Sequence, residues 1–189
     1  MKKQLMTIIV IGIGILVFTN MVTAGEKAPQ AVVDLANQKL TQIGQDSIIV
    51  EAVKNENAKS KSLEQIKNLD ATWKSDAGIA DYMQAIMESE CAKHLRSIQE
   101  GSDYFAEIFV MDNQGANVAM TDKTSDYWQG DEAKFKKSFA DGQGAIFIDE
   151  VEFDDSAQAY LVQVSVPVKD SGKAIGAITF GIDIDRIDQ

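Results

Sequence analysis

Residues 104–121 read YFAEIFVMDNQGANVAMT, and this stretch decides the fold. Its first half is aromatic and β-branched, which favours a strand, and DNQG at 112–115 has the composition of a hairpin turn. Residues 116–121 then return as the partner strand. Because a tight hairpin joins antiparallel strands, the stretch predicts an antiparallel sheet and argues against a βαβ repeat.

Downstream of this hairpin, the polar segment TDKTSDYWQGDE at 121–132 leads into a short amphipathic helix that carries Phe135 and Phe139. Glycines follow that helix, and the apolar pattern then predicts three more strands. The last two strands are joined by KDSG, a second hairpin turn. The glycines are Gly142 and Gly144, the strands cover about 145–151, 157–168 and 174–184, and the turn is 169–172.

Upstream, the hydrophobic spacing is helical. Pro29 suits a first helical turn, and a long helix is predicted from about residue 30 to residue 58. Shorter helices are predicted over 63–73 and 79–98. Helices first and strands afterwards make an α+β fold in one domain. One apolar seam on the long helix can pack on its own sheet or pair with a second copy as a homodimer; it comprises Val33, Ala36, Leu40, Ile43, Ser47 and Val50.

The first 24 residues have the pattern of a secretion signal. Lys2 and Lys3 precede an apolar stretch over 5–18, and Val22-Thr23-Ala24 offers the small residues that signal peptidase requires. Cleavage is expected between Ala24 and Gly25, and an uncleaved membrane anchor is the alternative. Either outcome places the domain at 25–189 outside the cytoplasm, in the periplasm or the extracellular space.

Charge and cysteine content narrow the function. The formal net charge is −11, and no basic patch interleaved with aromatic residues is present, so nucleic-acid binding is not expected. A chain with one cysteine, Cys91, cannot form an internal disulfide. The expected fold therefore depends on its hydrophobic core alone.

Together the long helix, the EIFVMDNQGANVAMT hairpin, TSDYWQGDEAKF and the ending QVSVPVKDSGKAIGAITFGIDI resemble a single Cache (PDC) sensor domain, an extracellular PAS-like family. The resemblance covers about residues 29–187. It implies an antiparallel sheet of about five strands with a long N-terminal helix and further helices packed on one face. It also implies a ligand-binding sensor, not an enzyme, that needs no cofactor. Such a receiver is expected to signal through a separate membrane receptor, kinase or transporter.

The resemblance also implies where a small molecule binds. One side of that site is the 121–132 loop and the other is the entrance to the fourth strand. This loop lacks the Arg with which amino-acid-binding relatives grip a carboxylate, so a neutral or cationic ligand, such as an amine, is favoured. The implied ligand-binding residues are Asp126, Tyr127, Trp128, Asp131, Glu132, Phe153, Asp154, Asp155 and Ser156.

Structural roles are the alternative for these residues. Tyr127 and Trp128 can cap the hydrophobic core, and Asp154 or Asp155 can form an Asx-type turn with Ser156. Two other functions stay open: a small enzyme that uses paired carboxylates, and an interaction protein without a ligand.

Cys91 and His94 lie three residues apart on one helical run, yet two ligands do not complete a zinc or haem site. We therefore expect no metal. A single histidine and the lack of a GxSxG motif give nucleophilic catalysis no support either.

Overall fold

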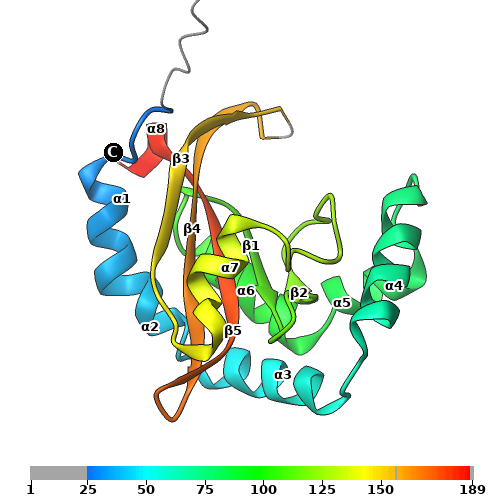
Figure 1. The fold of residues 1–189 in the computed structure, drawn as a ribbon. Coiled ribbons are helices and arrows are strands. Elements are labelled where there is room, and N and C mark those ends of the chain that lie inside the picture. The colour runs from blue at the N-terminus through cyan, green and yellow to red at the C-terminus, as the bar shows by residue number, and fades with distance from the viewer. Residues whose placement is uncertain (1–24, 156, 188–189) are drawn as a thin grey trace, which may run out of the picture.

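The computed structural model describes residues 25–155 and 157–187, so the predicted leader lies outside the described residues. Its centre is a five-stranded sheet in the order β2-β1-β5-β4-β3, in which every neighbouring pair is antiparallel. The predicted α+β fold with a five-stranded antiparallel sheet is confirmed. The strands are β1 (Phe105–Met111), β2 (Asn117–Met120), β3 (Phe147–Asp154), β4 (Ala159–Asp170) and β5 (Lys173–Asp183) (Figure 1).

Both predicted hairpin turns are present. In the first turn, the Asp112 carboxylate accepts hydrogen bonds from the backbone N–H groups of Gln114 (2.8 Å) and Ala116 (3.0 Å), and Gly115 has a φ of +84°. An Asp that bonds its own backbone and a left-handed Gly are the local features that reverse a chain. The turn within residues 104–121 therefore fixes the pairing of β1 with β2.

The long N-terminal helix is present but interrupted. After α1 (Gln30–Leu35), the π-helical turn η1 (Ala36–Leu40) and α2 (Thr41–Ile43), the helix stops at Gly44. Helix α3 (Ser47–Ala58) then begins behind the cap residue Asp46, whose carboxylate accepts from the backbone N–H groups of Ile48 and Ile49. The carbonyl of Gly44 accepts from the Lys169 N–H of β4, so the sheet itself holds the break.

The predicted helix over 79–98 is wrong as a single element. It divides at Glu88 and Ser89, because the Ser89 hydroxyl accepts from the Ala92 N–H and caps a new helix. The remaining helices are α4 (Leu63–Ser75), α5 (Asp81–Met87), α6 (Glu90–Glu100), α7 (Ala133–Phe139), the short 3-10 turn η2 (Ala140–Gly142) and α8 (Ile184–Ile187).

Two hydrophobic clusters lie on opposite faces of the sheet. On the first face, α1–α3 and α6 cover strand residues such as Ile108, Val164 and Phe180. On the second face, α7 packs on β3, β4 and β5, and the second cluster includes Phe109 and Phe135. Figure 1 shows α7 in front of the sheet and α4 beyond its β2 edge.

The seam of the N-terminal helix is largely used within the domain. Ala36 and Leu40 have no exposed surface, and Val33, Ile43 and Val50 are partly buried against the first cluster or beside it. Across the described ranges, the structure contains no helix with the length and apolar character needed to span a membrane.

Candidate functional site

The loop that carries Asp126, Tyr127 and Trp128 is fixed by helix α4. One oxygen of Asp70 accepts from the backbone N–H groups of Tyr127 (2.9 Å) and Trp128 (3.0 Å). The Lys74 ammonium forms ion pairs with both Asp70 and Asp126, and these contacts lower the Asp126 pKa against the opposing effect of its partial burial. The Asp126 carboxylate is therefore already neutralised by a residue of the protein.

The two aromatic side chains of this loop also have internal partners. Tyr127 is fully buried, and its hydroxyl accepts from the Lys61 ammonium at 3.1 Å. The indole N–H of Trp128 donates to the Gln114 carbonyl at 2.8 Å, and the Lys67 ammonium lies 4.6 Å from the centre of its ring. Trp128 thus holds the loop to the β1–β2 turn, and Tyr127 anchors it to Lys61 in the connection between α3 and α4.

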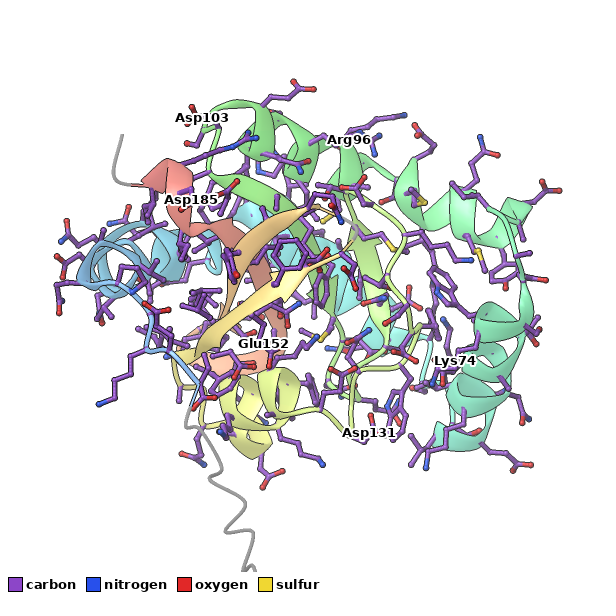
Figure 2. All side chains as sticks on the ribbon, turned by 90° about the horizontal axis from the view of Figure 1, so that it is seen from above. Lys74, Arg96, Asp103, Asp131, Glu152 and Asp185 are labelled. Atoms are coloured by element: carbon purple, nitrogen blue, oxygen red, sulfur yellow. The ribbon has the colours of Figure 1, made fainter. Side chains whose placement is uncertain are left out.

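The remaining loop acids lie elsewhere. Asp131 is exposed, and its backbone carbonyl accepts from the Lys136 ammonium. Glu132 precedes α7 and pairs with Lys134 at 3.0 Å. Figure 2 shows Asp131 at the margin of the molecule, well separated from Glu152 on β3. The predicted loop residues therefore do not converge on one point.

The second predicted group lies at the tip of the β3–β4 hairpin. Phe153 is half-exposed and meets Tyr160 edge-on, with ring centres 5.2 Å apart. The Asp154 carboxylate accepts from the Ala157 N–H at 2.8 Å, which is a local turn contact of the kind weighed for this position. Asp155 is exposed, and Ser156 lies outside the described residues.

A row of polar side chains that sequence reasoning missed crosses the second face of the sheet. Glu107 on β1 lies opposite Gly181 on β5, which in turn lies opposite Gln163 on β4. In the next row, Thr179 lies opposite Ser165, and the two hydroxyl oxygens are 2.7 Å apart. We call Glu107, Gln163, Ser165 and Thr179 the sheet site.

Two features of the sheet site bring its polar groups together. The Gln163 amide donates to the Glu107 carboxylate at 3.0 Å across the intervening β5 strand. A side chain on Gly181 is impossible here without movement, because a Cβ atom would lie 2.6 Å from Cγ of Glu107. The glycine thus leaves room for the Glu107 side chain to lie over β5.

Electrostatics distinguishes Glu107 from an ordinary surface acid. Burial raises its pKa, and the charges of Asp154 and Asp122 raise it further. The Gln163 hydrogen bond and the charge of Lys134 act in the opposite direction. A partly buried carboxylate among other acids is stabilised by an incoming cation, so this site is chemically suited to an amine.

The sequence contained a signal for this row. In YLVQVSVPV, at 160–168, Gln163 and Ser165 alternate with valines, and Glu107 holds the equivalent place in FAEIFVM. Polar residues at every second position of strands that are otherwise apolar indicate one polar face. Which strands bring their polar positions together depends on the strand order, which the sequence pattern did not supply.

Cys91 and His94 do not form a metal centre with other residues. Burial raises the pKa of the Cys91 thiol to about 12, with Asp46 and Glu90 adding to the rise, so it is not a thiolate ligand at neutral pH. Nε2 of His94 lies 3.2 Å from the Asp46 carboxylate that caps α3. Within 25–155 and 157–187, no group of three or more His, Cys, Asp or Glu residues is arranged to hold a metal ion.

Comparison with known proteins gives matches in structure alone. No sequence-family profile matches the chain, and no curated protein matches it in sequence. The solved structures to which it is similar include three bacterial sensor domains, each at low identity.

The sensor domain of the V. cholerae histidine kinase DctB is 13% identical with a TM-score of 0.38, over 83% of this chain and 59% of that one. The ligand-binding domain of the Campylobacter jejuni chemoreceptor Tlp3, in complex with 4-methylisoleucine, is 14% identical with a TM-score of 0.41, over 85% and 63%. The E. coli DcuS sensor domain is 16% identical with a TM-score of 0.38, over 67% and 94%. The chain thus spans about six tenths of the DctB and Tlp3 domains, and similarity at this level assigns no ligand to it.

Proposed function

We propose that this chain is an exported ligand-binding sensor domain of the Cache type, and that it binds a small neutral or cationic molecule at the sheet site. The observation that carries the proposal is the polar row of Glu107, Gln163, Ser165 and Thr179 in the middle of an otherwise apolar sheet. Buried polar groups cost free energy unless they serve folding or binding. Here they face the side of the sheet on which the Cache resemblance expects a ligand.

An amine is the ligand class that the charges favour. Besides burial, the charges of Asp154 and Asp122 raise the pKa of Glu107, and the charge of Lys134 opposes them. An ammonium group beside Glu107 relieves that repulsion and accepts the carboxylate as a partner. A carboxylate ligand would add to the repulsion.

The predicted site residues take three roles under this proposal. Glu132 pairs with Lys134, and the charge of Asp154 acts on Glu107. We therefore place both acids at the borders of the sheet site and assign them to the ligand. Asp126, Tyr127 and Trp128 frame the loop through their internal partners. Phe153 and its neighbours in the hairpin tip form the rim.

Ligand binding at such a site acts as a signal only if another protein responds to it. The proposed partner is a membrane receptor, a kinase or a transporter, and the change it reads is a difference between the free and bound shapes. Dimerisation through the N-terminal helix also stays a prediction, and light scattering of the purified protein tests it.

A ligand screen tests the proposed function. Unfolding temperature is followed against amines, quaternary ammonium compounds, amino acids, organic acids and purines, because a ligand that binds the folded state stabilises it. We expect a saturable rise with amines that Glu107→Gln diminishes and that Glu100→Gln, on the exposed end of α6, leaves unchanged.

Three outcomes would contradict the proposal. A rise with organic acids alone would overturn the amine preference, and a rise that Glu107→Gln leaves undiminished would overturn the site. Chemical conversion of a ligand by the purified protein would show an enzyme, the alternative that paired carboxylates left open.

A further inference from the structure

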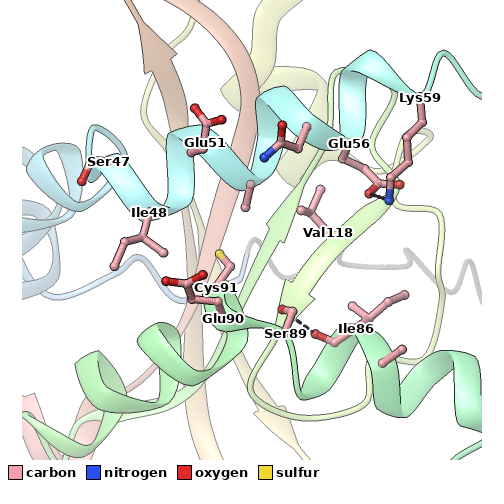
Figure 3. A pocket seen from close by; sticks show the side chains of 13 residues that line it. Ser47, Ile48, Glu51, Glu56, Lys59, Ile86, Ser89, Glu90, Cys91 and Val118 are labelled. Atoms are coloured by element: carbon pink, nitrogen blue, oxygen red, sulfur yellow. Dashed lines mark hydrogen bonds and ion pairs between the residues drawn. The ribbon is translucent and has the colours of Figure 1, made fainter.

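A concave region lies on the face of the sheet opposite the sheet site, between α3 on one side and α5 and α6 on the other. Its volume is about 620 Å³, within the range of small-molecule sites, and Figure 3 shows the helices on its two sides. Helices α3 and α6 both pack on the first face, whereas Glu107 of the sheet site points to the second. We call this region the helix groove.

The floor of the helix groove is apolar. Side chains from four elements meet there, and Cys91 among them is 4% exposed. Figure 3 shows Cys91 and Glu90 beneath Ile48, in the space between α3 and α6. The floor can therefore take the hydrocarbon part of a ligand; it consists of Ile48, Ala52, Ile86, Cys91 and Val118.

The rim of the helix groove is acidic. Three acids, Glu51 and Glu56 on α3 and Glu90 on α6, line it together with one cation, Lys59. Glu51 and Glu90 come from opposite helices, and both are exposed. Among residues 25–155 and 157–187, neither carboxylate has an ion-pair partner, whereas Glu56 farther along α3 is paired with Lys59 and Lys61. Glu51 and Glu90 thus supply the negative charge of the groove that is not already paired with a cation of the described residues.

Hydrogen-bond acceptors accompany these two acids. Ser47 and Asn55 on α3 and Ser89 before α6 also line the groove. Ser89 donates its hydroxyl hydrogen to the Ile86 carbonyl and accepts from the Ala92 N–H, so one oxygen lone pair is left for a neighbour. A primary ammonium group, which has three donors and no acceptor, matches such a rim.

We propose that the helix groove is a second binding site, for a primary alkyl ammonium compound whose hydrocarbon part lies on the apolar floor. The ammonium group then lies between Glu51 and Glu90. An anionic ligand is disfavoured by the same two carboxylates and by the formal charge of −11 on the whole chain. This site is independent of the sheet site, because it lies on the opposite face and shares no residue with it.

Binding of hexylammonium, measured by calorimetry on the purified protein, tests this proposal. Hexanol and hexanoate are the matched neutral and anionic probes. We expect hexylammonium to bind most tightly, and Glu51→Gln or Glu90→Gln to weaken it by roughly 2- to 5-fold each, the scale of exposed ion pairs. Glu100→Gln, at the far end of α6 and outside the groove, is the matched control and is expected to change nothing.

A second pair of variants tests the groove by shape. Ala52→Phe places a ring on the apolar floor and is expected to abolish hexylammonium binding, while Ala58→Phe, at the exposed end of α3, leaves it intact. Circular dichroism confirms that both variants are folded.

Three results would overturn the assignment: unchanged affinity in both Gln variants, equal binding of hexanol, or no hexylammonium binding by the wild type. Glu107→Gln separates the two proposals. If it alone removes hexylammonium binding, the amine binds at the sheet site and the helix groove is not a site. If it has no effect while the groove variants do, the groove stands whatever becomes of the sheet site.

Discussion

Asp70 is the single residue on which the 126–128 segment depends most. It is 7% exposed and accepts two backbone hydrogen bonds from that segment, in addition to its pair with Lys74. Asp70→Ala leaves two N–H groups without their acceptor, and we expect it to lower the free energy of unfolding by about 3 kcal/mol in urea denaturation. Asp70→Asn keeps an acceptor oxygen and is expected to cost less than half as much.

Exposed Glu100→Ala is the control for this prediction, with an expected change within about 0.5 kcal/mol. Equal effects of Asp70→Ala and Glu100→Ala would show that the loop is held by other contacts.

Glu107 makes stability depend on pH in a defined direction. Its pKa in the folded protein is raised, chiefly by burial, so the folded state disfavours the charged carboxylate. The stability contribution of the protonated form is complete below the ordinary carboxyl pKa and is lost as the pH rises through the raised value. Glu107→Gln removes this pH-dependent loss of stability, because the amide side chain does not ionise.

We therefore expect Glu107→Gln to gain stability relative to wild type between pH 4 and pH 7, by on the order of 1 kcal/mol. Unfolding curves at several pH values measure the difference. Glu152→Gln, at an exposed position on β3, is expected to show no such rise. A flat difference for Glu107→Gln across the same range would refute the assignment.

Among the structural elements, the junction between α2 and α3 is tightly constrained. Gly44 approaches β4 so closely that a Cβ atom there would lie 2.5 Å from the Pro167 carbonyl oxygen. Gly44→Ala is expected to destabilise the protein by roughly 1–3 kcal/mol, because backbone atoms on both sides have to separate. Thermal unfolding measures this against Gly78→Ala, where nothing lies within 4 Å and no comparable loss is expected. Equal losses would mean that the junction tolerates a side chain.

Local chemistry made most of these elements predictable. The turns at 112–115 and 169–172, and hence the β1–β2 and β4–β5 hairpins, follow from Asp and Gly at positions that reverse the chain. The helix breaks at Gly44 and Ser89 were less visible, because the apolar spacing continues through both. A serine in a helical run is a cap only if the chain bends there, and the bend comes from packing on the sheet.

The candidate site was less predictable than the fold. Tyr127 and Trp128 read as ligand contacts, but Asp70, more than fifty positions earlier in the chain, supplies their backbone acceptor. No local pattern connects α4 with this loop. The Glu107–Gln163 contact is likewise created by strand order, since β5 separates the two residues.

At the scale of the whole molecule, charge controls solution behaviour. The formal charge is −11 and the isoelectric point is about 4.5, so repulsion between molecules falls as the pH approaches that value. We expect light scattering to rise between pH 6 and pH 4.5, and Glu152→Lys, which removes a negative charge from β3, to shift the onset upward. Unchanged scattering at pH 4.5 would show that charge does not keep these molecules apart.

Part of the negative charge that keeps the molecules apart lies on the outer strand of the sheet. Strand β3 is at the edge of the sheet; its Val151 N–H donates to the Glu26 carbonyl, and the acids Asp149, Glu150, Glu152 and Asp154 lie along it. Like charges on an edge strand discourage another molecule from adding a strand there. Acid tolerance then depends on this short run of carboxylates, because their protonation removes the repulsion that keeps the edge from pairing with another strand, the step from which fibrils start.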